Sequence, residues 1–258
     1  DTSILPNFGI EQALRDLKAR GLLREGEVRR IAVIGPGLDF TDKESGYDYY
    51  PQQTLQPFAV QDSLLRLGLA KSGTIQVKVF DISARVLNHM RRAREQARQG
   101  RGYVVQLPRD PSSAWVPAAV EYWQTFGDQI GAAAAPLQPP AQLERLEKRA
   151  MQIRPAAVLA CDPLDLNIVL QRLERGEMPA AERFDVVIAT NVFVYYDALE
   201  QALALANVSA MLKPGGFFLS NDELAALPDG SLASAGSTAV RYSEKPAVGD
   251  SIHWYRRR

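Results

Sequence analysis

Two glycines flank a proline at Gly35-Pro36-Gly37, directly after the first short apolar run of the sequence. Glycine at the end of a buried strand allows a ligand to approach the backbone, and the next helix can offer its free amide groups to that ligand. The steric needs of a tight connection explain the same turn equally well. The dinucleotide fingerprint G-x-G-x-x-G/A is incomplete here, because Phe40 stands at its third small position. The turn by itself therefore leaves both interpretations open.

An acidic residue, Asp81, ends the second apolar run, Val77-Lys78-Val79-Phe80, and is followed by Ile82. A carboxylate at the tip of the second strand of a parallel sheet can accept hydrogen bonds from both hydroxyls of a ribose. The alternative is that Asp81 supports the start of a helix that begins near Ser83, itself a plausible cap. We favour the ribose role, because Asp81 stands at the right place in the order of elements.

A third group of polar residues, Cys161-Asp162-Pro163-Leu164-Asp165, follows the third predicted strand. Asp162 could accept a hydrogen bond from the exocyclic amine of an adenine, while Leu164 lies against the ring and Pro163 belongs to the same contact segment. A helix cap is the alternative for Asp162 and explains it nearly as well.

Polar and aromatic residues also follow the fourth predicted strand, residues 184–189. Ligands of open parallel sheets bind at the carboxyl ends of the strands, which makes Asn191 a candidate binding residue. Tyrosines offer an apolar face and a hydroxyl to a substrate, although packing at the sheet edge explains any one of them at least as well. The candidate substrate residues are Tyr49, Tyr50, Tyr195 and Tyr196.

Short apolar runs alternate with helical patterns along most of the chain, and such runs are typical of parallel strands that helices cover on both faces. The predicted strands are residues 31–34, 75–80, 156–160, 184–189 and 216–220. The predicted helices are residues 9–23, 58–67, 83–99, 164–175 and 197–212. Alternating patterns at residues 237–242 and 251–256 predict a closing antiparallel hairpin.

This order of elements predicts one α/β domain over residues 1–258, with a doubly wound, mostly parallel sheet of about seven strands and a C-terminal antiparallel hairpin. Residues 1–29 form an N-terminal helical extension. Residues 101–150 are rich in proline and interrupt the alternation, so we expect a helical insertion with one or two helices. Its aromatic residues between Trp115 and Phe126 could form a lid over a substrate, but a satellite core is the favoured interpretation.

Thirty basic and thirty acidic residues leave the 258-residue chain without net charge. We expect no nucleic acid partner and no membrane, because a neutral total gives no long-range attraction to phosphates and no apolar run approaches the roughly 20 residues that span a bilayer. Cys161 is the only cysteine and the chain has two histidines, so we expect no metal site. A cytoplasmic location fits the single cysteine. The sequence begins with Asp1 and not with Met, so it constrains the location only weakly. The oligomeric state is left open.

From about residue 30 to the end, apart from the insertion, the chain resembles class I S-adenosylmethionine (SAM)-dependent methyltransferases. The resemblance rests on the turn Gly35-Pro36-Gly37 and on three further motifs. These are Val79-Phe80-Asp81-Ile82, Phe184-Asp185-Val186-Val187-Ile188 and Leu212-Lys213-Pro214-Gly215-Gly216. It implies SAM as the cofactor, with Gly35 and Gly37 beside its methionine part. It also implies Asp81 at the ribose, Asp162 at the adenine and Asn191 at the amino acid end.

The chain departs from the family pattern in its first strand, where Ala32-Val33-Ile34 lacks an acidic residue. Asp39, or another acid in the long loop of residues 38–55, could compensate. The resemblance implies a methyltransferase that acts on an unidentified small molecule or exposed protein side chain, with no catalytic residue named. The alternatives are a catalytically inactive SAM- or nucleotide-binding module of the same fold and, disfavoured by the glycine pattern, an NAD-dependent oxidoreductase.

Overall fold

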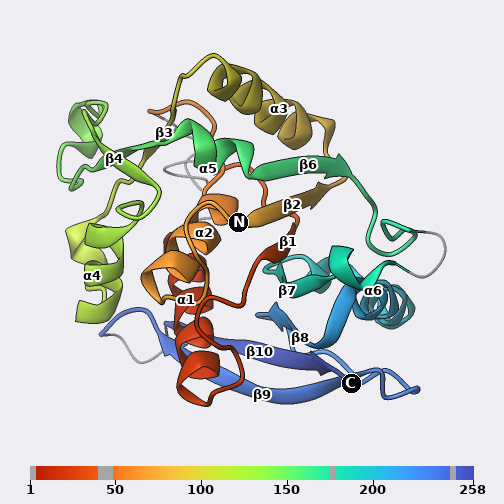
Figure 1. Cartoon of the computed structure of the whole chain (residues 1–258). Coiled ribbons are helices and arrows are strands. Elements are labelled where there is room, and N and C mark those ends of the chain that lie inside the picture. The colour runs from red at the N-terminus through yellow and green to blue at the C-terminus, as the bar shows by residue number, and fades with distance from the viewer. Residues whose placement is uncertain (1–3, 40–48, 175–177, 245–247) are drawn as a thin grey trace.

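The structure is a computed structural model that describes residues 4–39, 49–174, 178–244 and 248–258. Its main element is a seven-stranded sheet with the order β6-β2-β1-β7-β8-β10-β9. In Figure 1, β6 lies at the top of this sheet and β9 and β10 lie at the bottom. The strands are β1 (Arg30–Ile34), β2 (Gln76–Asp81), β6 (Cys161–Asp165), β7 (Phe184–Ala189), β8 (Leu212–Ser220), β9 (Leu232–Arg241) and β10 (Gly249–Arg257).

The pairing of these strands confirms the predicted fold class. From β6 across to β8 every neighbouring pair is parallel, whereas β10 runs antiparallel to both β8 and β9. Both faces are covered, which explains why the central strands read as uninterrupted apolar runs. In β1, Ile31 and Val33 belong to one hydrophobic core, and Ala32 and Ile34 belong to the other.

Four long helices cover the two faces of the sheet. The bounds are α1 (Ile4–Ala19), α2 (Gln56–Arg66), α3 (Ala84–Arg98) and α6 (Ala198–Met211). The first three pack into the core that contains Ile31, and α6 packs into the other core. Asp197 and Glu200 form a capping box at the start of α6, which explains why the helix begins at this point. The predicted helices at 9–23, 58–67, 83–99 and 197–212 are thus confirmed, with α1 beginning earlier than expected.

The prediction for residues 156–175 is wrong. The expected strand at 156–160 is the short helix α5 (Pro155–Leu159), which begins with a proline in its first turn. The third strand of the parallel half of the sheet is β6, and residues 166–174 form turns and bends in place of the expected helix. Because β6 is an edge strand, it tolerates Asp162 and Pro163, which made this segment resemble a loop.

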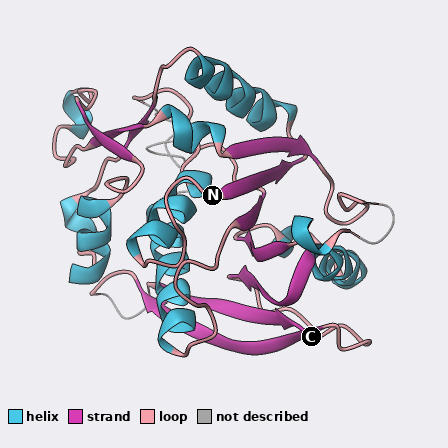
Figure 2. Cartoon of the chain, in the orientation of Figure 1, coloured by secondary structure: helices cyan, strands magenta, loops and turns pink. Residues whose placement is uncertain are grey.

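The insertion contains a small sheet that the sequence did not reveal. β3 (Tyr103–Gln106), β5 (Ala150–Ile153) and β4 (Gly131–Ala134) form a three-stranded antiparallel sheet, which lies apart from the main sheet in Figure 2. The expected helix is present as α4 (Pro117–Thr125). Tyr122, Trp123 and Phe126 are buried in the same core as α1 and α2, so these aromatic side chains pack as core. Short 3₁₀ turns complete the list: η1 (Pro111–Ser113), η2 (Ala141–Leu143), η3 (Ala180–Glu182) and η4 (Phe193–Tyr195).

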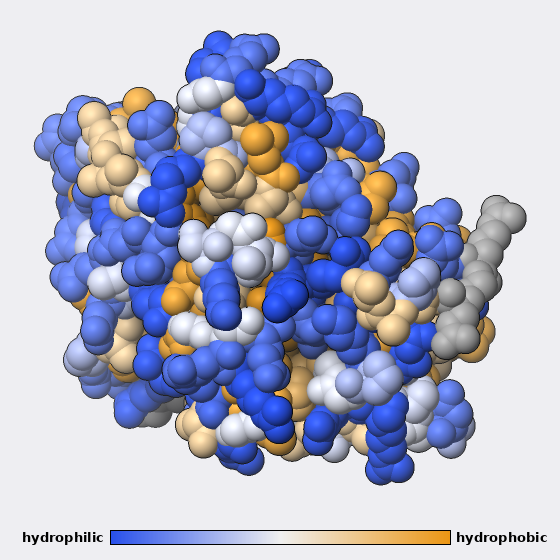
Figure 3. Space-filling view, viewed as in Figure 1, coloured by the Kyte–Doolittle hydropathy of each residue, from blue (hydrophilic) through white to orange (hydrophobic). Residues whose placement is uncertain are grey.

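Figure 3 shows how hydrophobic and hydrophilic residues are distributed on one face of the molecule. In the face shown in Figure 3, hydrophobic residues occur in small separate areas on a mostly hydrophilic surface. Within the described ranges, no helix combines the length and apolar character needed to cross a bilayer.

At the amino ends of the strands, the carboxylate of Asp185 joins β7 to both of its neighbours. Its Oδ2 accepts hydrogen bonds from the backbone amides of Arg29 and Arg30, each at 2.8 Å. Its Oδ1 accepts from the ammonium group of Lys213 in β8. Gly216 lies where a Cβ would come within 2.9 Å of the Lys213 carbonyl oxygen and 3.1 Å of the Asp185 carbonyl oxygen. The motifs containing Asp185 and Lys213 are therefore one structural unit.

Replacing Asp185 with alanine removes the acceptor of two backbone amides together with the partner of Lys213. We expect the free energy of unfolding to fall by about 1.5–3 kcal/mol, as is usual for hydrogen bonds to charged groups. Urea unfolding followed by circular dichroism measures this loss. Lys213→Met keeps the amide bonds and removes only a partly exposed ion pair, so it should cost less than about 1 kcal/mol. Equal losses in the two variants would contradict this assignment.

Cys161 distinguishes the observed β6 from the loop that the sequence predicted at this position. The thiol is fully buried, and burial raises its pKa to about 12. We expect iodoacetamide at pH 8 to leave Cys161 unmodified in the folded protein and to alkylate it in urea, because only the thiolate reacts. Mass spectrometry measures the adduct. Rapid modification of the folded protein would show that Cys161 lies outside the strand.

Candidate functional site

The carboxyl ends of β6, β2, β1 and β7 meet at one edge of the sheet, because these strands are adjacent and parallel. Ile34 is paired with Phe80 on one side and with Ala189 on the other. Asp81 is paired with Asp165 in β6. The turns that follow these strands therefore lie side by side, as is usual for ligand sites in such sheets.

Asp81 connects two of these turns through its carboxylate. Its Oδ1 accepts a hydrogen bond of 2.8 Å from the amide of Ser83, whose own side chain makes no capping bond to α3. Burial raises the pKa of Asp81, and hydrogen bonds from the backbone of Ser83, Gly37 and Ile82 oppose this rise. The charge of Asp165 adds to the rise. Asp81 is 9% exposed, so a largely buried carboxylate supports both the Gly37 turn and the start of α3.

Ile82 and Asp165 border Asp81 on the solvent side. Ile82 is 66% exposed, which is unusual for a large apolar side chain next to a buried carboxylate. Asp165 is the last residue of β6 and is exposed. This edge of the sheet thus combines the carboxylates of Asp81 and Asp165, which can accept hydrogen bonds, with the exposed apolar side chain of Ile82.

The predicted turn at residues 35–37 has backbone angles that glycine adopts more easily than other residues. Gly35 and Gly37 have φ angles of 63° and 65°, in the left-handed region. The amide of Gly35 donates to the carbonyl of Phe80 at 2.8 Å, which ties the turn after β1 to β2. A Cβ on Gly35 would lie 2.7 Å from Cγ2 of Val192, so packing also requires glycine here. Pro36 separates the two glycines.

Asn191 follows β7 with a φ of 56°, a conformation that asparagine tolerates better than most residues. Its amide donates to Oδ1 of Asn221 at 2.8 Å, and its own Oδ1 accepts from Nδ2 of Asn221 at 2.8 Å. Asn221 also donates to Asp250 at 3.3 Å. Asn191 is therefore held at the point where the ends of β7 and β8 meet the start of β10.

Gln56 is a candidate site residue that sequence reasoning missed. It begins α2, is fully buried, and donates from Nε2 to Oγ1 of Thr190 at 2.7 Å. Among the residues that the structure describes, its buried Oε1 finds no donor. Nothing in the sequence marks Gln56, because only the strand order brings the start of α2 against the end of β7.

The expected location of Asp162 and Pro163 is wrong. Both lie inside β6, where Asp162 pairs with Lys78 and Pro163 with Val79. The Asp162 carboxylate forms ion pairs with Lys78 and Arg94. Asp162 is therefore three positions before the carboxyl end of its strand, and Asp165 occupies the place that we expected Asp162 to fill.

The four candidate tyrosines have different surroundings. Tyr50 is buried and donates to Oδ2 of Asp39 at 3.2 Å, and the ring of Tyr49 meets its ring edge-to-face at 5.3 Å. Tyr196 packs against Phe193, and its pKa is raised by burial and, to a smaller extent, by the charges of Glu200 and Asp81. Tyr195 is 80% exposed.

The loop predicted at residues 38–55 is described in part, since residues 40–48, with Phe40, lie outside the described residues. At its two ends, Asp39 and Gln53 form an isolated antiparallel bridge. In the described parts of the chain, no group of three or more His, Cys, Asp or Glu side chains is placed to hold a metal ion.

No protein-family model matches the sequence, and no curated protein is found as a relative. Similar solved structures include the N-methyltransferase NodS from Bradyrhizobium japonicum WM9, with 10% identity, a TM-score of 0.41 and coverage of 96% of each chain. The glycopeptide N-methyltransferase MtfA with S-adenosyl-L-homocysteine has 12% identity, a TM-score of 0.45 and coverage of 96% of this chain and 89% of MtfA. Magnesium protoporphyrin IX methyltransferase (ChlM) from Synechocystis PCC 6803 with bound SAM has 10% identity, a TM-score of 0.39 and coverage of 97% and 80%.

Gly35→Ala and Gly21→Ala form a matched pair of substitutions at left-handed glycines. Gly21 has a φ of 68° and nothing within 4 Å of an added Cβ, whereas Gly35 lies against Val192. We expect both variants to lose about 1–2 kcal/mol of stability through the backbone, and Gly35→Ala to lose about 1–3 kcal/mol more through overpacking. Adding Val192→Ala should recover only the second part. If Val192→Ala recovers nothing in denaturant unfolding, packing does not explain Gly35.

Proposed function

We propose that this chain binds SAM at the carboxyl edge of β6, β2, β1 and β7 and transfers its methyl group to a small molecule or an exposed protein side chain. The observation that carries the proposal is the buried carboxylate of Asp81 at the tip of β2, between the glycine turn and the exposed Ile82. When bound, SAM supplies a methyl group that its sulfonium already activates. The protein then has to align the acceptor and exclude water.

Asp81 would hold the ribose, and Ile82 would lie against the adenine. A carboxylate has about four lone-pair sites, and the amide bonds to Asp81 use only part of them. The exposed Asp165 replaces Asp162 as the acceptor proposed for the adenine amine, because it stands at the end of β6 beside Asp81.

Gly35, Gly37 and Asn191 would border the methionine part of SAM. Oε1 of Gln56 supports this placement, since it is buried near the end of β7 and accepts no hydrogen bond from any residue that the structure describes. Burying such an atom costs free energy unless a donor reaches it, and the ammonium group of SAM is a donor of the right kind. The residues present at this edge therefore fit the cofactor.

The second candidate is a module of the same fold that binds SAM or a nucleotide without catalysis. β1 supports it, because its residues Ala32, Val33 and Ile34 are all buried and apolar and offer no acidic side chain to the cofactor. Calorimetry with S-adenosylhomocysteine and NAD, followed by incubation of labelled SAM with a broad cell extract, separates the readings. Binding without transfer of the label supports the inactive module, and binding of NAD alone supports an oxidoreductase.

Asp81→Asn tests the ribose role while keeping an oxygen that can accept from the amide of Ser83. We expect this variant to bind S-adenosylhomocysteine about 1.5–3 kcal/mol more weakly than the wild type, because the charged acceptor of the diol is lost. Isothermal titration calorimetry measures the affinity, and thermal unfolding shows whether the fold is kept. A lower melting temperature with unchanged affinity would assign Asp81 to the support of α3 alone.

Asp162→Asn is the matched control for Asp81→Asn. Its carboxylate lies within β6 and is paired with Lys78, so we expect the affinity for S-adenosylhomocysteine to stay unchanged. Asp165→Asn should weaken binding instead. The reverse result would restore Asp162 as the adenine contact.

A further inference from the structure

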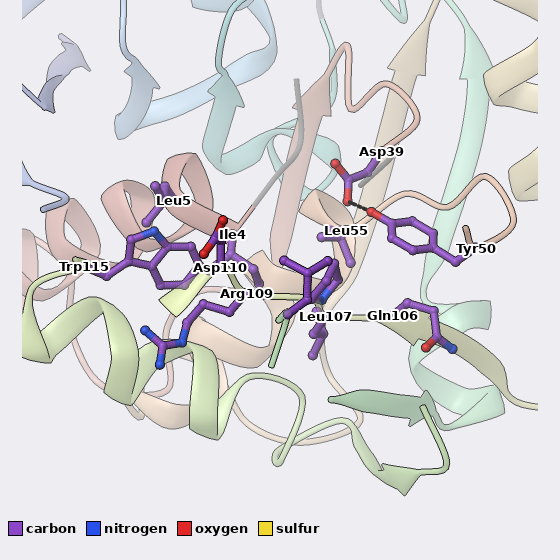
Figure 4. A pocket seen from close by; sticks show the side chains of 12 residues that line it. Ile4, Leu5, Asp39, Tyr50, Leu55, Gln106, Leu107, Arg109, Asp110 and Trp115 are labelled. Atoms are coloured by element: carbon purple, nitrogen blue, oxygen red, sulfur yellow. Dashed lines mark hydrogen bonds between the residues drawn. The ribbon is translucent and has the colours of Figure 1, made fainter. Parts of the chain in front are cut away.

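A cavity of about 220 Å³ lies between the start of α1, the segment around Tyr50 and the insertion (Figure 4). Its walls are mostly apolar and include Ile4, Leu5, Leu55 and Leu107, with the ring of Trp115 on one side. Typical ligand pockets measure about 300–1,000 Å³, so this cavity is smaller than most of them and suits only a compact molecule.

One end of the cavity carries a buried carboxylate. Asp39 is 4% exposed and lines the cavity together with Tyr50. Its Oδ2 accepts hydrogen bonds from the hydroxyl of Tyr50 at 3.2 Å and from Nε2 of Gln53 at 3.4 Å, and Figure 4 shows the first of these. Asp39 comes two residues after Gly37, so the carboxylate stands next to the turn proposed for the methionine part of SAM.

The other end of the cavity carries charges that are paired with each other. Nε of Arg109 donates to Glu147 at 2.8 Å, and the guanidinium group lies over the rings of Trp115 and Trp123. Asp110 pairs with Arg145 at 3.1 Å. Hydrogen bonds from Ser112 and the charge of Arg145 lower the pKa of Asp110, so it stays ionised in these contacts.

We propose that this cavity binds a primary or secondary amine with a compact apolar body, and that this amine is the acceptor of the proposed methyl transfer. The apolar walls take the body of the ligand, and the Asp39 carboxylate takes the N–H groups in charge-assisted hydrogen bonds. A carboxylate ligand is repelled by the negative charge of Asp39, and an alcohol carries no positive charge that Asp39 could pair with. The binding step stands on the cavity, and only the transfer step rests on the proposed function.

The transfer step balances without a further reactant. The bound ammonium group first gives one proton to the Asp39 carboxylate, which passes it to solvent, and the nitrogen is left with a lone pair. This lone pair forms the new N–C bond as the bond between methyl carbon and sulfur breaks, and sulfur keeps that electron pair as a neutral thioether. The methylated nitrogen carries the positive charge that sulfur has lost. Asp39 thus orients the nitrogen and receives its proton before the transfer.

Three probes that share a phenylethyl group and differ in the polar group attached to it test the binding step directly: phenethylamine, 2-phenylethanol and 3-phenylpropanoate. We expect calorimetry to show that the amine binds at least about tenfold more tightly than the alcohol or the acid, with or without S-adenosylhomocysteine. Asp39→Asn should remove this preference. Asp110→Asn is the matched control and should keep it, because Asp110 lies at the other end of the cavity, where it pairs with Arg145 and neighbours Arg109.

Leu5→Trp tests the location without touching a carboxylate. The larger side chain should fill the cavity and abolish amine binding, while affinity for S-adenosylhomocysteine and the melting temperature stay as in the wild type. Equal affinity for amine and alcohol, binding of none of the probes, or amine binding that survives Leu5→Trp would each overturn the cavity proposal. Amine binding in a protein that never binds S-adenosylhomocysteine would support the cavity and contradict the methyltransferase function.

Discussion

The carboxylate of Asp185 fixes how the central strands of the sheet lie against each other. It binds the backbone amides of Arg29 and Arg30 and the ammonium group of Lys213, so one side chain joins the amino ends of three strands. Once these ends are level, the parallel register brings Ile34 beside Ala189 and Ala189 beside Ser220 at the opposite edge. The relative positions of the strand ends at the candidate site therefore depend on contacts made at the opposite edge of the sheet.

Sequence reasoning was reliable for elements whose burial produces a distinctive apolar pattern. The strands β1 and β7 are covered on both faces and appear in the sequence as apolar runs, and the helix predicted at residues 197–212 is present as α6. It failed at the edge of the sheet, since β6 pairs on one side only and can carry Asp162 and Pro163 without an apolar pattern. The neighbouring apolar residues of α5 resemble a strand because five residues are too few to show a helical period.

The site itself could be predicted only in part, for a related reason. Asp81 and the two glycines stand at strand ends that the apolar runs locate, so their meeting follows from the strand order. Gln56 had no such signal, because its role depends on the contact between the start of α2 and Thr190. The error at Asp162 came directly from the misplaced strand, since moving β6 by five residues moves its carboxyl end from Ala160 to Asp165.

The buried polar groups between α1, α2 and the insertion determine where the cavity beside Asp39 can lie. Glu11 of α1 accepts from Ser63 of α2 at 2.8 Å, and Asp62 accepts from the amide of Gln129 in the insertion at 2.9 Å. Arg66 forms ion pairs with both carboxylates, and this pairing offsets the free-energy cost of burying each charge alone. Because these contacts are directional, they set the position of the insertion more narrowly than apolar packing alone would. The walls from the insertion and from α1 are thereby held beside the turn after β1, where a ligand of the cavity would meet the carboxyl edge of the sheet.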